Sequence, residues 1–236
     1  MPVSMRQVAR DCLGRSGAVS MTRDVFGYIF GQPGRPFGLL DQLTLAKGTA
    51  CNFSVILVGH RDDFSGTISR ADVTKVTYAV QRTRELYAQV NVGIRKVYWT
   101  YIPEEDVGGY TVISDSGEAK NLTEDWSASN DGLDVFFVQS ILNAGGWSTQ
   151  SGPCDKSEKG FSGSVVELTG SNEITAILTA HEVGHYLGLG TGPASTNVMG
   201  VDSNNDGIDE IGTASTNLTS SQGSTMRSHC SIRSAC

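Results

Sequence analysis

Two histidines and a glutamate lie within one five-residue stretch, and their spacing suits metal-dependent hydrolysis. His181 and His185 are four residues apart, and Glu182 follows the first of them. On a helix, residues four apart lie on the same face, so both imidazoles can bind one metal ion. Zinc held in this way lowers the pKa of a bound water to about 7. A nearby carboxylate can take the proton of that water and later give it to a leaving amine. We therefore expect His181 and His185 to bind zinc and Glu182 to act as general base and then as general acid.

The surrounding residues predict the helix that this geometry requires. From residue 169 to residue 187, apolar residues and the two histidines recur at three-to-four spacing. Ser171 or Asn172 can cap the first turn, where Glu173 suits the helix dipole. Gly188 follows the last turn as a stop signal. The alternative is a pair of structural histidines on an apolar face, but the helix context and the glycine stop favour a metal site.

The segment from Ile174 to Met199 resembles the metzincin family of zinc metallopeptidases. The residues from His181 to Gly188 match the H-E-x-x-H-x-x-G part of the family signature, and Asn197-Val198-Met199 is similar to its Met-turn. The resemblance extends loosely over residues 53 to 229. It implies a secreted zinc endopeptidase that hydrolyses peptide or protein substrates, with Met199 beneath the metal.

The sequence departs from the family pattern at the third zinc ligand. Thr191 stands three residues after Gly188, where the family has a histidine or an aspartate. A histidine at residue 191 should therefore tighten zinc binding. Other candidates downstream are Asp202, Glu210 and His229, and the remaining alternative is a site without a third ligand.

This departure leaves two further interpretations of the chain open. The first is a metzincin-like pseudo-enzyme or binding module that lacks the third zinc ligand and is catalytically impaired. The second is a two-histidine metal hydrolase that acts on a substrate other than a peptide. The presence of Glu182 favours an active enzyme, since a carboxylate at this position has little structural role.

An acidic stretch beyond residue 199 is a candidate calcium site, with the possible ligands Asp202, Asn204 and Asp206. Oxygen-bearing side chains at alternate positions, followed by a glycine, are typical of the start of a calcium-binding loop. Thr213 stands at the twelfth position, where a glutamate is expected, so Asp209 or Glu210 would have to close the site. The alternative is an acidic turn without a metal.

Length, charge and composition exclude several other classes of protein. The chain has 236 residues, a formal net charge of −7 and no apolar run long enough to span a membrane. An acidic chain does not favour nucleic-acid binding. We expect a monomer with an N-terminal extension or prosegment remnant at residues 1–50 and a metallopeptidase domain at residues 51–236. The first 20 residues lack the apolar core of a signal peptide.

Five cysteines allow at most two disulfides, and the sequence does not indicate their connectivity. Cys230 and Cys236 are close enough in sequence to bridge a small loop. Residues 149–161 are polar and contain glycine, which predicts a surface loop.

The order of predicted elements indicates an α/β (α+β) fold. Periodicity predicts a long helix at 69–90, a short helix opening at Thr219, and strands at 55–58, 94–102, 110–113, 133–141 and 163–169. We expect a mixed twisted sheet, a long backing helix, the active-site helix and a small irregular C-terminal subdomain. The resemblance implies that substrate binds in a cleft below an edge strand, with residues 135–147 as candidates for its rim.

Overall fold

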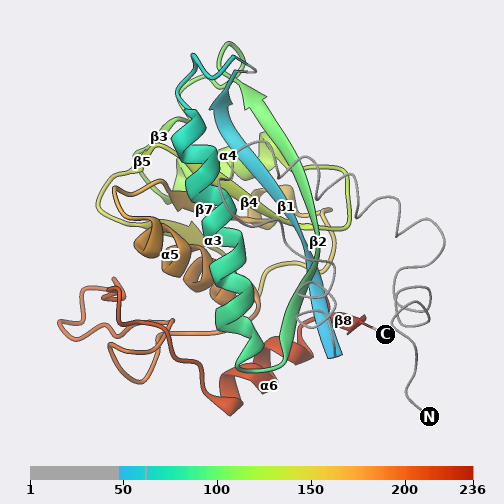
Figure 1. Cartoon of the computed structure of the whole chain (residues 1–236), viewed down its shortest axis with the longest axis vertical. Coiled ribbons are helices and arrows are strands. Elements are labelled where there is room, and N and C mark those ends of the chain that lie inside the picture. Colours follow the sequence, from blue (N-terminus) through green and yellow to red (C-terminus); the bar gives the residue numbers. More distant parts are fainter. Residues whose placement is uncertain (1–47, 62, 236) are drawn as a thin grey trace.

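The computed structural model describes residues 48–61 and 63–235, and Figure 1 shows their arrangement. The predicted extension at residues 1–50 lies almost wholly outside this part of the chain and stays a prediction, although the first strand already begins at Gly48. In chain order, the elements are β1 (Gly48–His60), α3 (Arg70–Ala88), β2 (Val92–Pro103), β3 (Val112–Ile113), α4 (Ser116–Trp126), β4 (Leu133–Val138), β5 (Ser140–Ile141), β6 (Gly146–Ser148), the 3-10 helix η1 (Lys159–Phe161), β7 (Ser164–Glu167), α5 (Asn172–Tyr186), α6 (Ser220–Ser228) and β8 (Arg233–Ala235).

A mostly parallel sheet organises the fold, with the strand order β2-β1-β4-β7-β6. Strands β1, β2, β4 and β7 run parallel, whereas β6 runs antiparallel to β7 at the edge. The short strand β8 pairs antiparallel with the first three residues of β1. The prediction of a mixed α/β sheet with two long helices is therefore confirmed.

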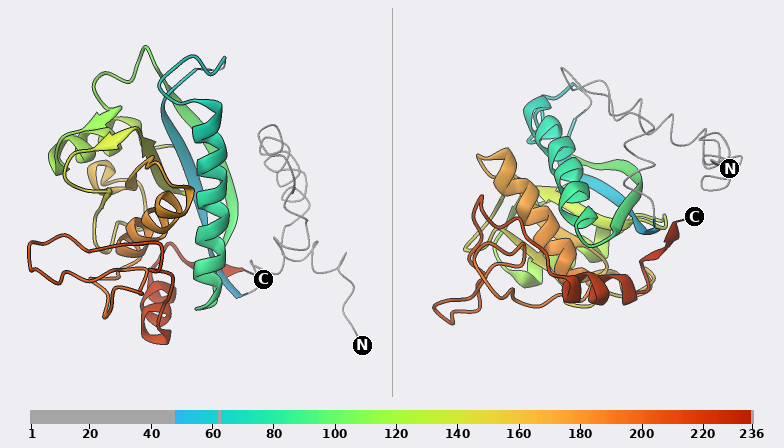
Figure 2. Two further views of the ribbon diagram at one scale, coloured as in Figure 1. Left: turned by 60° about the vertical axis from the view of Figure 1, so that its left-hand side comes forward. Right: turned by 60° about the horizontal axis from the view of Figure 1, so that its bottom comes forward.

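Helices cover both faces of this sheet (Figure 2). Because side chains alternate between the faces of a strand, Phe53 and Val55 of β1 pack into one hydrophobic core with α3 and α5, while Ile56 packs into a second core. The second core contains Ala119 and Leu122 of α4. Helix α5 thus lies beside α3 on one face, and α4 lies on the opposite face.

The predicted elements and the observed ones differ at three places. Helix α4 was not predicted, although Asp115 caps it by accepting hydrogen bonds from the N–H groups of Gly117 and Glu118. The predicted strand at 133–141 is interrupted after Val138, and β5 pairs with β3 in a separate two-stranded sheet. Strands β6 and β8 are too short to show periodicity in the sequence.

One disulfide joins the loop before η1 to the segment after α6, through Cys154 and Cys230. The suggested pairing of Cys230 with Cys236 was therefore wrong, because the partner of Cys230 is 76 residues away in the sequence. Cys51 is a free thiol in the core, and burial raises its pKa to about 12. Within the described residues, no helix is both long enough and apolar enough to cross a membrane.

Candidate metal centre

Helix α5 is almost entirely buried, which makes it a rigid support for the side chains of its last two turns. Its first turn is capped by Ser171, whose hydroxyl accepts a hydrogen bond from the N–H of Ile174. Along the helix, Ala176, Ile177 and Ala180 pack into the core that also contains α3. The sequence therefore predicted this helix correctly, and burial on nearly all sides fixes where His181 and His185 lie.

The C-terminus of α5 ends in a Schellman motif at Gly188, which has φ +95°. The N–H of Gly188 donates to the carbonyl of His185 at 2.9 Å, and the N–H of Leu189 donates to that of Gly184 at 3.0 Å. A left-handed conformation at this turn is the reason for a glycine. The turn brings the carbonyl of Leu189 back to the Nδ1 atom of His185, 2.9 Å away.

The two imidazoles face each other through their Nε2 atoms, which are 3.0 Å apart. Each Nδ1 lies against a backbone carbonyl: that of Val198 for His181, at 3.1 Å, and that of Leu189 for His185. A carbonyl only accepts hydrogen bonds, so Nδ1 of each ring carries a proton, and Nε2 is the nitrogen that faces the other ring. Burial, and then the neighbouring His185, lower the pKa of His181 to about 3, so this ring is neutral. A cation between the two rings would be bound by both Nε2 atoms at once.

Asp209 supplies a carboxylate that forms, with His181 and His185, a group of three side chains that could hold a metal ion. Its Oδ2 atom lies 3.6 Å from Nε2 of His185 and 3.9 Å from Nε2 of His181. A tetrahedral zinc with ligands at about 2.05 Å requires ligand atoms about 3.3 Å apart. The three distances of 3.0, 3.6 and 3.9 Å lie around that value, so the donor set fits zinc in both chemistry and size.

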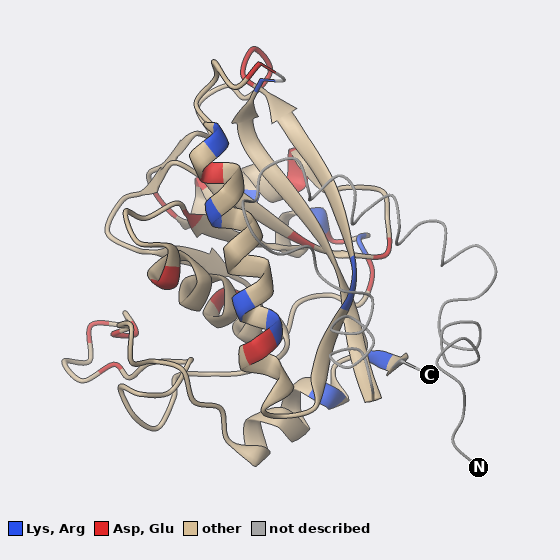
Figure 3. Ribbon diagram, viewed as in Figure 1, with Lys and Arg blue, Asp and Glu red and all other residues tan. Residues whose placement is uncertain are grey.

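Asp209 is held by a short hairpin between α5 and α6. The N–H of Glu210 donates to the carbonyl of Val201 at 2.9 Å, which closes the hairpin one residue beyond the ligand. The segment from α5 to α6 carries acidic residues and no Lys or Arg, as Figure 3 shows. This hairpin is the reason that Asp209 reaches histidines more than 20 residues before it in the sequence.

The hairpin tip contains the residues predicted to hold calcium. The Asp202 carboxylate accepts hydrogen bonds from the N–H groups of Asp206 and Gly207, both at 3.0 Å, and Asp206 accepts one from Ile208 at 2.9 Å. These contacts describe an acidic turn that is stabilised by its own backbone. Calcium binding by Asp202, Asn204 and Asp206 stays a prediction.

The residues that the sequence suggested as the third zinc ligand have other neighbours than the two histidines. Thr191 is exposed and lines a shallow pocket with residues of α6, in which neither histidine takes part. Glu210 accepts from the Ser203 hydroxyl, and Nε2 of His229 lies 2.9 Å from the carbonyl of Gly152. Asp202 belongs to the hairpin tip. From the sequence, Asp209 was predicted only as a candidate calcium ligand, because no periodicity or motif connects it with the helix.

Glu182 lies beside this group of ligands and is buried. Its Oε1 atom is 4.0 Å from Nε2 of His181. Burial, and to a lesser extent the charge on Asp209, raise the pKa of Glu182 to about 8. Among the described residues, no side chain or N–H donates a hydrogen bond to its carboxylate. The group therefore has the position expected of a general base and is held there by packing.

The turn predicted to resemble a Met-turn packs directly under the helix. Met199 is fully buried, and a Cβ atom on Gly184 would lie 2.6 Å from its sulfur atom. The turn is fixed by Asn197, which exchanges two hydrogen bonds with the side chain of Gln222, a residue of the α6 capping box. The same turn directs the carbonyl of Val198 to His181, so it orients one of the two imidazoles.

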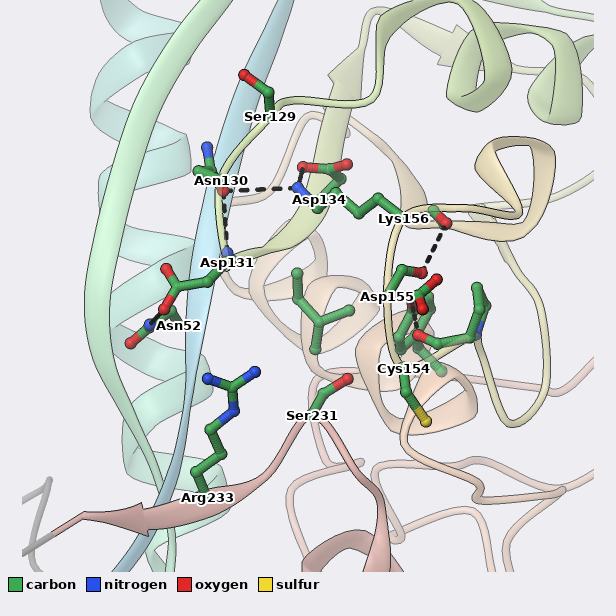
Figure 4. Close-up of a pocket in the computed structure, with 15 residues that line it drawn as sticks. Asn52, Ser129, Asn130, Asp131, Asp134, Cys154, Asp155, Lys156, Ser231 and Arg233 are labelled. Carbon is green, nitrogen blue, oxygen red and sulfur yellow. Dashed lines mark hydrogen bonds and ion pairs between the residues drawn. The ribbon is translucent and has the colours of Figure 1, made fainter.

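A second hollow, of about 390 Å³, lies between the start of β4, the 153–156 loop and β8, and Figure 4 shows its lining. Lys156 reaches across it to the buried Asp134, 2.6 Å away. Burial raises the pKa of Asp134 despite this ammonium group. Asp131 accepts hydrogen bonds from Asn52 and Tyr98. Most of the charged lining is thus paired within the protein, and the hollow contains none of the predicted site residues.

No family model and no curated protein matches the chain. Among solved structures, it is similar to archaemetzincin from Methanopyrus kandleri, with a TM-score of 0.47 and 16% identity over 75% of this chain and 94% of that one. It is also similar to metalloproteinase-II from Bacteroides fragilis, with a TM-score of 0.48 and 14% identity over 75% of this chain and 52% of the other. A chain from a chaperone–substrate complex has a TM-score of 0.46 and 16% identity, with 75% and 33% covered. The chain thus spans about half of the Bacteroides protein and a third of the last one. These likenesses are too weak to assign a family, so the function must be argued from the site.

Proposed function

We propose that this protein is a zinc-dependent peptidase in which His181, His185 and Asp209 bind the metal and Glu182 is the general base. The observation that carries the proposal is the pair of facing Nε2 atoms 3.0 Å apart, with a carboxylate oxygen within 3.9 Å of both. Burying two imidazole nitrogens and a carboxylate oxygen this close together costs free energy unless a cation pairs with them.

The donor set favours zinc over the hard cations. Imidazole nitrogen and one carboxylate oxygen suit zinc, whereas magnesium and calcium are bound by oxygen ligands. Two histidines and one acidic residue form a known type of catalytic zinc site with one position left open. When bound, zinc would polarise the scissile carbonyl and acidify the attacking water.

The protein's own groups then carry the proton transfers. Glu182 takes a proton from the attacking water and returns it to the nitrogen of the leaving amine. The carbonyls of Val198 and Leu189 hold both imidazoles in the tautomer that presents Nε2. Because Glu182 is not one of the three ligands, its replacement should affect turnover without removing the metal.

A peptide is the favoured substrate because an edge strand lies next to the base. Among the strands of the described residues, β6 is the last in the sheet and pairs with β7 alone. Its Gly146 touches Glu182, so an extended peptide added to the free edge of β6 would pass close to the base. We therefore propose that residues 146 and 147, at the end of the predicted 135–147 segment, form the substrate rim, because Val135 and Phe136 are buried in the sheet. Secretion belongs to the same proposal and agrees with the Cys154–Cys230 disulfide.

The pseudo-enzyme interpretation depended on a missing third ligand. Asp209 now supplies a candidate for that ligand, which favours an active enzyme. A two-histidine hydrolase that acts on a different substrate shares the metal chemistry, and only the substrate assay separates it from a peptidase.

The test is to purify the protein without added zinc, measure its metal content, and assay cleavage of casein and gelatin with and without a chelator. We expect about one zinc per chain and a peptidase activity that the chelator abolishes. Glu182→Gln should lower turnover by about 10²- to 10⁴-fold while zinc stays bound. Zinc binding without cleavage of either protein would reject the peptidase, and near-normal activity of Glu182→Gln would reject its role as base.

A further inference from the structure

The edge strand β6 approaches the active-site helix so closely that one of its residues has no room for a side chain. A Cβ atom on Gly146 would overlap Cγ and Oε1 of Glu182 and would lie 2.6 Å from its Cδ atom. Real Cβ atoms essentially never show heavy-atom contacts below 3.0 Å. Since β6 is paired through Gly146 with Val166 of β7, the strand cannot move aside without breaking the edge of the sheet.

The backbone conformation of Gly146 is not the reason for a glycine at this position. Gly146 is not among the glycines with positive φ, so an alanine would meet no backbone strain there. The absence of a side chain matters only because of the neighbouring carboxylate. The preceding residue, Gly145, is also close to α5, but a Cβ atom there would meet Leu178 at 2.6 Å and not Glu182.

The contact matters for Glu182 because its carboxylate has no hydrogen-bond donor among the described residues and is held by packing. Its Oε1 atom lies 4.0 Å from Nε2 of His181, which is beyond hydrogen-bonding distance. A glutamate side chain has three rotatable bonds, so a carboxylate without hydrogen-bonding partners depends on packing for its orientation. The backbone of Gly146 is the surface against which Cγ, Cδ and Oε1 pack.

We infer that Gly146 is a positioning residue, whose missing side chain leaves the space in which the Glu182 carboxylate is held toward the metal centre. The inference rests on the proposed function of Glu182 as general base. Any larger residue at 146 pushes the carboxylate away from this position, and displacement of a catalytic group by about 1 Å can lower the rate by about 10²-fold.

The activity test compares Gly146→Ala with two glycine variants that do not touch the base. Gly146→Ala should lower kcat by about 10²-fold, with little change in KM and with the same zinc content. Gly145→Ala disturbs the same contact between strand and helix through Leu178 and should retain kcat. Gly170→Ala, which has open space around its Cβ position, controls for the substitution itself. An equal fall of kcat in Gly145→Ala and Gly146→Ala would mean that general packing of β6, and not the contact with Glu182, is responsible.

A stability cycle tests the contact independently of activity. Gly146→Ala should lower the Tm in the wild-type background and have little effect in the Glu182→Ala background, where the overlapping atoms are gone. If Gly146→Ala does not fold alone but folds together with Glu182→Ala, the inference is supported as well. The same Tm loss in both backgrounds, or failure to fold in both, overturns the inference about Gly146 and leaves the proposed function standing. A zinc-bound wild type that cleaves no protein substrate overturns the proposed function and with it the role of Gly146 in catalysis.

Discussion

Helix α5 and the Val201–Glu210 hairpin bring ligands to the same point by opposite means. The helix is buried along most of its length, begins at a serine cap and ends in a Schellman motif. The hairpin is largely exposed, and its tip is held by backbone N–H groups that donate to Asp202 and Asp206. Two of the proposed ligands and the proposed base therefore come from a rigid element, and the third proposed ligand comes from an exposed one.

This difference indicates how the free energy of metal binding is divided. Ligands on the helix are already in place, so binding costs them little conformational entropy. Asp209 depends on a hairpin with few buried contacts, and such segments open locally at low free-energy cost. We therefore expect the helix to provide most of the metal affinity and the hairpin to complete the geometry.

Removing one ligand from each region should give the largest effects and test this division. Loss of a supporting partner of a metal ligand typically costs 10- to 100-fold in affinity. His185→Ala, which removes a ligand itself, should weaken zinc binding by more than about 100-fold. Asp209→Asn should weaken it by about 10- to 100-fold. Competition with a chromophoric chelator measures both affinities.

Thr191→His is the matched control for the hairpin variant. The resemblance to the family predicts tighter zinc binding, whereas the exposed position of residue 191 predicts no change. If Asp209→Asn keeps the wild-type affinity and Thr191→His increases it, the third ligand comes from the loop after α5 and not from the hairpin.

Removing the disulfide that anchors the loop at the C-terminus of α5 should have an intermediate effect. It should change stability more than metal binding. The N–H groups of Ser151 and Gly152 donate to the carbonyls of His185 and Tyr186, at 3.0 and 2.9 Å. The Cys154–Cys230 disulfide anchors this loop. Replacing both cysteines by serine should lower the free energy of unfolding by about 2–4 kcal/mol.

Urea unfolding with zinc present measures that change. Zinc affinity should fall less than in Asp209→Asn, because the Schellman motif and the Val198 carbonyl still orient the histidines. A loss of zinc as large as in His185→Ala would show that the rigidity of the helix end depends on the disulfide.

The smallest effect is expected at the hairpin tip. If Asp202, Asn204 and Asp206 bind calcium with a dissociation constant of about 1 mM, a few millimolar calcium stabilises the folded state by about 1 kcal/mol. Calorimetry of chelated protein should then show a Tm higher by a few degrees after calcium is added. Asp206→Ala should lose this response. No shift in the wild type would leave the tip as an acidic turn held by its own backbone.

The long helices could be predicted because their signals are local. Ser69 and Asp72 form the capping box that opens α3, and the apolar stripe that follows continues to Tyr87 and Val90. Helix α4 was missed because it has only 11 residues and begins in a polar segment. Strands β6 and β8 have three residues each, and they are strands only because β7 and β1 pair with them.

In the candidate site, the sequence by itself determined the relative positions of the residues that lie on one helix. The four-residue spacing of His181 and His185, with Glu182 beside them, follows from helical geometry and needs no knowledge of the rest of the chain. Asp209 and Gly146 become neighbours of this group only when the hairpin closes and β6 packs across α5. Such contacts between distant segments leave no period in the sequence, because they depend on the route of the chain through space. Only the tertiary structure therefore decided which carboxylate faces the histidines and which residue holds the base.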